Sequence, residues 1–106
     1  MVSNMSNNRM QLRPLDFSLL SELIDGRNLA ANLYVQLDVS RAYVNNRLSL
    51  LEDYGLVARV GPNPNAGLYE ITDSGRWALD HREQYYDEDV DFDALFEKEF
   101  SGRDGP

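Results

Sequence analysis

The sequence predicts a mainly helical domain with one small β-hairpin. Apolar residues recur at helical spacing in the first half of the chain and again near its end. Two short runs of β-type residues follow the first helical segments, and Gly, Pro or Ser separates the segments from one another. The 106 residues suit a single compact core with tails. We expect this domain over residues 12–86, a flexible N-terminal tail over 1–11 and an acidic C-terminal segment over 87–106.

Two helices are predicted in the first part of the domain. The first covers residues 14–25, because Pro14 is tolerated in a first helical turn and Gly26 supplies a stop. Five Leu and Ile residues between them form one apolar stripe. A short second helix fits residues 29–37, in which leucine recurs every fourth residue.

The third predicted helix, residues 41–54, follows a tight turn over residues 38–40. Ser40 is a favourable N-cap because its hydroxyl can accept a hydrogen bond from the first helical turn. Gly55 marks the end of the helix, since glycine is preferred just beyond a helix C-terminus. Two helices joined in this way form a helix-turn-helix pattern.

A hairpin and a fourth helix complete the domain. The runs 56–60 and 68–71 are predicted as strands, joined by a loop over 61–67 that is rich in Gly, Pro and Asn. Thr72 is placed to cap a fourth helix that we expect to extend to about Tyr86. The predicted order is α-α-α-β-β-α.

The C-terminal segment carries most of the negative charge. The net charge is −8, and residues 79–106 hold ten acidic and three basic residues. The acidic run over 87–93 is expected to be solvated. A calcium loop is disfavoured there, because Phe92 and Lys98 occupy the positions where that loop needs Gly and a bidentate Glu.

A short amphipathic helix is also predicted over residues 92–100. Its apolar residues Phe92, Leu95, Phe96 and Phe100 are spaced as one helical face. Because an isolated helix of this length is marginal in water, it needs a docking surface. That surface is the domain itself, a second copy of the chain or a protein partner.

Composition excludes several function classes. The chain has no Cys and a single His81, which we expect on the surface of the fourth helix, so it offers no thiolate metal site and no histidine cluster. No phosphate-binding loop or catalytic constellation is present, and we expect no enzyme activity, no metal and no cofactor. No apolar run approaches the roughly 20 residues that cross a bilayer, and the expected location is the cytoplasm.

The third helix carries one polar face. At about 100° per residue, Val44, Leu48 and Leu51 fall on its apolar side. The opposite side holds small and hydrogen-bonding residues, namely Arg41, Ala42, Asn45, Asn46 and Ser49. Such a face suits a major groove, where Asn can pair with adenine, Arg with guanine, and Ala can touch a thymine methyl group.

The sequence S-R-A-Y-V-N-N-R-L-S-L-L-E-D-Y-G-L-V-A-R-V, followed after the turn by L-Y-E-I-T-D-S-G-R, resembles the winged helix-turn-helix pattern of prokaryotic transcription regulators. It is most similar to the haloarchaeal branch related to the repressor of the halophilic phage φH. The resemblance covers residues 12–82 and implies a winged helix-turn-helix fold that binds double-stranded DNA. Scarce lysine, at one of ten basic residues, together with abundant Asp and Glu is likewise typical of halophile proteins.

The resemblance also implies the site. The matched recognition-helix residues are Ser40, Arg41, Ala42, Tyr43, Asn45, Asn46 and Arg47. Arg59 matches a strand position near the phosphate backbone, and residues 63–67 match the wing. Many such wings carry Arg or Lys at the tip, whereas Asn63 and Asn65 are uncharged, so we expect hydrogen bonds to phosphate or sugar there.

We therefore predict a sequence-specific DNA-binding regulator, a repressor by resemblance, that acts as a homodimer on an inverted repeat. Arg41, Asn45 and Asn46 are expected to meet base edges, and Arg47 and Arg59 to hold phosphates. Arg47 could instead pack its stem on the domain and pair with an acidic residue. Tyr43 could serve the core or the DNA. The alternative functions are a winged-helix module that binds protein, or an acidic mimic of DNA.

Overall fold

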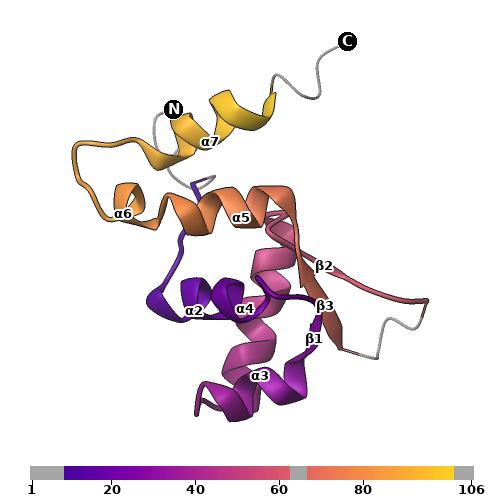
Figure 1. The fold of residues 1–106 in the computed structure, drawn as a ribbon. Coiled ribbons are helices and arrows are strands. Elements are labelled where there is room, and N and C mark those ends of the chain that lie inside the picture. Colours follow the sequence, from indigo (N-terminus) through magenta and orange to yellow (C-terminus); the bar gives the residue numbers. More distant parts are fainter. Residues whose placement is uncertain (1–8, 63–66, 102–106) are drawn as a thin grey trace.

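The computed structural model describes residues 9–62 and 67–101. Its elements are α2 (Pro14–Glu22), β1 (Asn28–Leu29), α3 (Ala30–Gln36), α4 (Arg41–Asp53), β2 (Val57–Arg59), β3 (Leu68–Ile71), α5 (Asp73–Asp80), α6 (Arg82–Tyr85) and α7 (Phe92–Ser101). Helices α2, α3 and α4 form the lower half of the molecule in Figure 1, and α5 lies across their upper side. The predicted mainly helical fold with a small hairpin is confirmed.

Local chemistry explains where the helices begin and end. The Ser40 hydroxyl accepts a hydrogen bond from the backbone N–H of Tyr43 at 3.1 Å, and the Thr72 hydroxyl accepts one from Gly75 at 3.1 Å. Both predicted caps are thereby confirmed. Gly55 ends α4 with a φ of 81°, a left-handed conformation that glycine adopts without steric cost.

The sheet has one strand more than the sequence predicts. Strands β2 and β3 pair antiparallel, with Val57 opposite Ile71. Strand β1 adds to the other edge of β3, so the sheet order is β1-β3-β2. In this arrangement Leu29, predicted as the start of the second helix, pairs with Leu68. A strand of two residues leaves no periodic pattern, which is why the sequence did not indicate it.

The predicted fourth helix is interrupted at His81. Helix α5 ends at Asp80, and α6 begins at Arg82. The His81 ring stacks on Trp77 with 4.0 Å between ring centroids, and its Nδ1 lies 2.8 Å from the Trp77 carbonyl oxygen. The imidazole is thus half-buried against the Trp77 ring. It also lies within hydrogen-bond distance of the Trp77 carbonyl oxygen, which accepts the backbone N–H of His81 as well.

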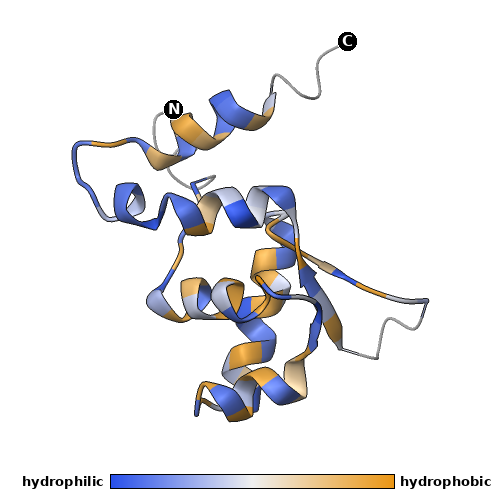
Figure 2. Cartoon of the chain, viewed as in Figure 1, coloured by the Kyte–Doolittle hydropathy of each residue, from blue (hydrophilic) through white to orange (hydrophobic). Residues whose placement is uncertain are grey.

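The core lies where α2, α4 and α5 meet. Its fully buried side chains include Leu19, Leu20, Leu23, Leu33, Val44, Leu48, Leu51 and Leu56. Apolar and polar residues alternate along α2 and α4, as the colouring of Figure 2 shows. Gly75 allows α5 to approach the chain at Leu56, because a Cβ atom at this position would lie 2.1 Å from the Leu56 carbonyl oxygen.

Helix α7 lies along α5, at the top of Figure 1. The Trp77 ring on α5 contacts Phe92 at 5.4 Å, Phe96 at 5.7 Å and Phe100 at 6.0 Å between ring centroids. The helix predicted over 92–100 is therefore present, extends to Ser101, and docks on its own chain. None of the described helices is long and apolar enough to span a membrane.

Residues 9–12 connect α7 to α4. Arg9 pairs with Asp91 at 3.1 Å, and the backbone N–H of Met10 donates to Asp93 at 3.0 Å. The next two N–H groups donate to tyrosine hydroxyls: Gln11 to Tyr54 at 3.0 Å and Leu12 to Tyr85 at 2.7 Å. These bonds fix the end of the predicted tail; its first eight residues lie outside the described part of the chain.

Candidate nucleic-acid interface

A four-residue connection, residues 37–40, joins α3 to α4. Asp38 has a φ of 55°, a left-handed conformation that Asp adopts more readily than most residues. Its backbone N–H donates to the Val35 carbonyl at 3.2 Å, and that of Val39 donates to Tyr34 at 3.1 Å. The turn is therefore closed by its own backbone hydrogen bonds, and α4 starts from a fixed position.

The predicted polar face of α4 points outward. Its residues Arg41, Ala42, Asn45, Asn46 and Ser49 are all exposed. On the opposite side Val44, Leu48 and Leu51 are 0% exposed. The helix thus presents amide, hydroxyl, methyl and guanidinium groups to its surroundings, and no described residue covers them.

Arg13 is a cationic neighbour of this face that the sequence analysis missed. Its Nη1 donates to the Tyr43 hydroxyl at 3.4 Å, so the folded chain brings an exposed guanidinium from the start of α2 to the edge of α4. Tyr43 itself is half-buried. Among the described residues, no carboxylate oxygen lies within 4.0 Å of a guanidinium nitrogen of Arg13 or of Arg41. Both cations are therefore available to an anionic partner.

The structure contradicts the predicted phosphate contact of Arg47. Its side chain turns inward, where Nε donates to Asp16 Oδ1 at 2.8 Å and Nη2 to Asp16 Oδ2 at 2.6 Å. The hydrogen bonds to Asp16 raise the pKa of Arg47 above its usual value, and burial opposes them. The alternative role predicted for Arg47, pairing with an acidic residue, is the one that the structure shows.

Arg59 lies on β2 beside the C-terminal half of α4. Its Nε donates to Glu52 at 3.0 Å, and its guanidinium lies 5.5 Å from the Tyr69 ring centroid. The hydrogen bond to Glu52 is the main reason that the pKa of Arg59 is raised. A phosphate would have to compete with Glu52 for this cation. Asn63 and Asn65, predicted to contact phosphate or sugar, lie outside the described residues.

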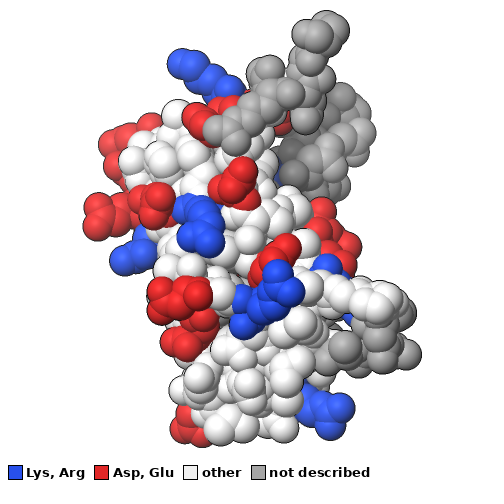
Figure 3. Space-filling view, turned by 45° about the vertical axis from the view of Figure 1, so that its right-hand side comes forward, with Lys and Arg blue, Asp and Glu red and all other residues white. Residues whose placement is uncertain are grey.

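Charge around the candidate interface is mixed. Figure 3 shows acidic and basic side chains interspersed over the visible surface. The acidic residues of α4 itself, Glu52 and Asp53, lie at its C-terminal end, whereas its N-terminal turns carry Arg41 and no acid. Asp38 is the acidic residue in the preceding turn. The first two turns of α4 are therefore the part of this helix best suited to an anionic ligand.

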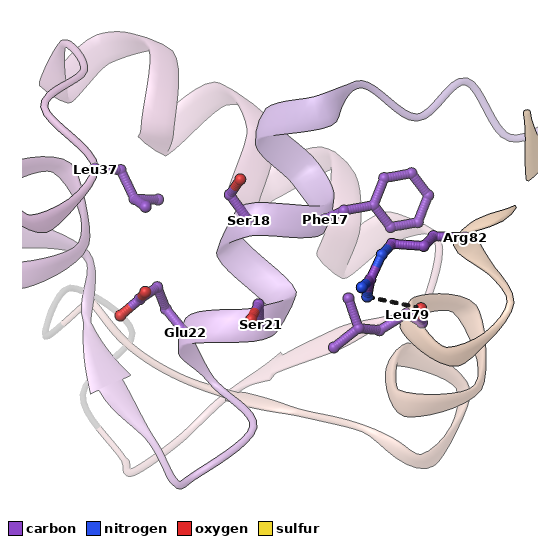
Figure 4. A pocket seen from close by; sticks show the side chains of 7 residues that line it. All are labelled: Phe17, Ser18, Ser21, Glu22, Leu37, Leu79 and Arg82. Carbon is purple, nitrogen blue, oxygen red and sulfur yellow. Dashed lines mark hydrogen bonds between the residues drawn. The ribbon is translucent and has the colours of Figure 1, made fainter.

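A separate surface hollow of about 300 Å³ lies on the other side of α2. Its lining side chains are Phe17, Ser18, Ser21, Glu22, Leu37, Leu79 and Arg82 (Figure 4). Arg82 donates to the Leu79 carbonyl at 3.4 Å. None of the residues predicted to contact DNA lines this hollow. Within the described part of the chain, no three His, Cys, Asp or Glu side chains are grouped to hold a metal ion.

Comparison with solved structures identifies the architecture. The chain superposes on the adhesin competence repressor AdcR from Streptococcus pyogenes with a TM-score of 0.60 and 18% identity, over 97% of this chain and 78% of AdcR. It superposes on the oxidized form of MarR from E. coli with a TM-score of 0.59 and 21% identity, over 89% of this chain and 75% of MarR. The chain has a winged-helix fold.

A further winged-helix match is ZitR from Lactococcus lactis, described as a zinc-responsive MarR family member. The TM-score is 0.58 at 19% identity, over 72% of this chain and 54% of ZitR. The present chain thus spans about half the length of ZitR. ZitR in complex with DNA also matches, with a TM-score of 0.54 and 15% identity over 92% of this chain and 79% of that one. No protein-family model and no curated protein matches the chain. The resemblance to haloarchaeal repressors therefore stays a prediction.

Proposed function

We propose that this winged-helix protein is a sequence-specific, double-stranded DNA-binding transcriptional regulator that reads the major groove with α4. The observation that carries the proposal is the exposed Arg41/Asn45/Asn46 face of α4, on a helix set by a tight turn after α3. A helix in this arrangement commonly enters the major groove with its first turns nearest the bases. The solved complex of ZitR with DNA supports the proposal from a related fold.

The side chains of the face define the contacts that we propose. Arg41 can donate two hydrogen bonds to guanine, and Asn45 and Asn46 can each pair with adenine through one donor and one acceptor. The Ala42 methyl group can touch a thymine methyl group. The N-terminal end of α4, capped by Ser40, can face a phosphate, because its backbone N–H groups carry partial positive charge.

Phosphate contacts are assigned to the edges of the face. Arg13 stands at the edge formed by Tyr43, and Arg59 lies by the C-terminal half of α4, where it exchanges Glu52 for a phosphate. Asn63 and Asn65 of the wing keep their assignment to phosphate or sugar. These contacts position the protein on the duplex, and the bases confer the specificity.

The remaining details are part of the proposal. The regulator acts in the cytoplasm as a homodimer on a short inverted repeat, since two-fold symmetry in the protein is mirrored in the half-sites. It represses by occupying its site, as the resemblance to the φH repressor group suggests. DNA binding through these groups requires no cofactor.

The test is selection of DNA by the full-length protein. Duplexes enriched from a random pool should share a motif, and fluorescence anisotropy should then show weaker binding of that motif by Arg41→Ala and by Asn46→Ala. Each lost base contact should cost about 1–3 kcal/mol, or about 5- to 150-fold in affinity. Arg76→Ala, at an exposed arginine on α5, is the matched control and should bind as the wild type does.

Two outcomes would overturn the proposal. One is that no motif is enriched at any salt concentration. The other is that both α4 variants bind the motif as tightly as the wild type. The first result would favour the alternatives, a protein-binding module or a DNA mimic, and the second would place DNA binding on a surface other than the polar face of α4.

A further inference from the structure

Arg47 and Asp16 form a buried ion pair with two side-chain hydrogen bonds. The Asp16 side chain is 0% exposed and that of Arg47 is 11% exposed. Besides its two bonds to Asp16, Arg47 donates through Nη2 to the Gln11 carbonyl at 3.0 Å. Asp16 Oδ2 also accepts the backbone N–H of Arg13 at 2.7 Å. The ion pair thus joins the middle of α4 to the start of α2, with further hydrogen bonds from Arg47 to Gln11 and from Arg13 to Asp16.

Stability alone does not explain an ion pair at this place. Removing two charges from water costs free energy that their attraction often fails to offset, so apolar side chains of similar volume frequently serve stability as well or better. The neighbouring α4 side chains, Val44, Leu48 and Leu51, already bury an apolar face. What a bidentate pair adds is direction, because the planar guanidinium matches the carboxylate in one relative orientation.

That direction matters for the exposed face. Arg47 follows Asn46 in the chain, so one backbone step separates the buried pair from a residue proposed to read bases. Side-chain ends lie about 5–6 Å from a helix axis, and a rotation of about 20° therefore moves them by about 2 Å. Hydrogen bonds tolerate only about 0.5 Å in length. The two hydrogen bonds from Arg47 to Asp16 join α4 to α2 in one relative orientation and therefore oppose such a rotation.

The same network reaches the edge of the face. Arg13, whose backbone N–H binds Asp16, places its guanidinium on the Tyr43 hydroxyl. Tyr43 precedes Arg47 by one helical turn. The ion pair is therefore connected, through the backbone of residue 13, to the exposed cation that contacts Tyr43.

We propose that Asp16 and Arg47 are positioning residues that set the rotation of α4 about its own axis, and thereby determine the base specificity of the protein without touching DNA. The inference rests on the proposed function. A purely structural pair would support folding and leave discrimination between DNA sequences unchanged in any variant that still folds.

The experiment replaces the pair in the full-length protein by apolar residues, Asp16→Leu with Arg47→Met. Urea unfolding and circular dichroism measure folding, and anisotropy measures affinity for the selected motif, for the motif with one base pair exchanged, and for unrelated DNA. We expect a folded protein with unchanged affinity for unrelated DNA. Discrimination against the exchanged base pair should fall by roughly tenfold, within the range that one base pair contributes.

Arg47→Lys provides a second variant in case the double replacement does not fold. It keeps the charge and loses the two-pronged geometry, so discrimination should fall by a smaller factor than in the double variant. Arg76→Lys, the same exchange at an exposed arginine, is the matched control and should change neither quantity.

The outcomes separate the two proposals. A wild-type protein that enriches no DNA motif overturns the proposed function. A wild type that enriches a motif, together with a folded variant that discriminates equally well, overturns only the positioning role. An equal loss of affinity for the motif and for unrelated DNA in the folded Asp16→Leu/Arg47→Met protein would also overturn it, because that pattern identifies Arg47 as a phosphate contact.

Discussion

At the residue scale, Gly75 shows how one small side chain sets the packing of an element. It lies in the T-D-S-G-R segment at the start of α5, where the helix crosses the chain at Leu56. A Cβ atom there would meet the Leu56 carbonyl oxygen at 2.1 Å and Ile71 Cγ1 at 2.7 Å. The carbonyl belongs to the backbone and cannot turn away as a flexible side chain can. The backbone of Gly75 is helical, a conformation that any residue can adopt. Glycine is therefore required because a side chain would collide with Leu56 and Ile71.

We accordingly expect Gly75→Ala to destabilise the fold by at least about 1–3 kcal/mol, the usual cost of forcing extra atoms into a packed site. The direction is the reverse of intrinsic helix propensity, which favours Ala over Gly by about 1 kcal/mol. Thermal or urea unfolding checks the prediction, with Arg76→Ala on the exposed side of the same helix as control. A Gly75→Ala protein as stable as the wild type would show that α5 does not approach Leu56 so closely.

Other residues show what periodicity can and cannot determine. The exposure of Asn45 and Asn46 was predictable, because their angle on the helix decides it. At about 100° per residue, Arg47 falls on the same side of α4 as Leu51, and its partner Asp16 is 31 residues away along the chain. Arg13 gave no signal for the same reason, since only the folded chain places it beside Tyr43. Periodicity therefore indicated the side of α4 on which Arg47 lies, but it did not indicate the partner of either arginine.

At the element scale, caps and periodic patterns predicted most of the fold. Helix α4 begins at Arg41 after its Ser40 cap, and its last residue is one short of the predicted end. Helix α2 ends at Glu22 instead of residue 25, because the last three residues form a turn. Strand β1 and the interruption at His81 were not predicted, since each depends on a partner from elsewhere: β3 for the strand and the Trp77 ring for the histidine.

Helix α7 is the element whose stability depends most on tertiary contact. Phe92 is 3% exposed and contacts Trp77 at 5.4 Å and Tyr85 at 5.1 Å between ring centroids. We expect Phe92→Ala to release α7, because a helix of 10 residues is marginal in water without its docking surface. Hydrogen exchange should show lost protection of the α7 amides while those of α4 remain protected.

Leu95→Ala is the control for that experiment, because Leu95 lies on the same helix and is 37% exposed. It should leave the α7 amides nearly as protected as in the wild type. Retained protection of α7 in the Phe92→Ala protein would mean that the other rings suffice. Loss of protection in α4 as well would mean that the two helices unfold together.

At the scale of the whole molecule, net charge bears on the proposed binding to DNA. The net charge is −8, yet the exposed face of α4 carries Arg41 and has Arg13 at its edge. Long-range attraction to DNA is consequently weak. Each phosphate neutralised contributes about −0.9 to the slope of log affinity against log salt concentration. With few cations at the proposed interface, we expect affinity to fall only slowly as the salt concentration rises. The affinity should then depend mainly on short hydrogen bonds.

Arg13→Ala tests this view of the interface. It should weaken binding to the selected motif and to unrelated DNA by the same factor, and should make the salt slope shallower by about 0.9, the contribution of one phosphate. Anisotropy titrations over a series of salt concentrations give both values, with Arg76→Ala as the matched arginine control. An unchanged slope would place Arg13 away from the phosphates.

The aromatic contact between α5 and α7 has a practical consequence. Trp77 is the one tryptophan of the chain, and its indole lies against three phenylalanine rings of α7. Fluorescence excited at wavelengths that only tryptophan absorbs therefore originates at the contact between α5 and α7. Detachment of α7 would expose the indole and shift its emission to longer wavelength, whereas a change confined to α4 would leave the emission wavelength unchanged. The molecule thus carries a built-in optical reporter for the state of its acidic end.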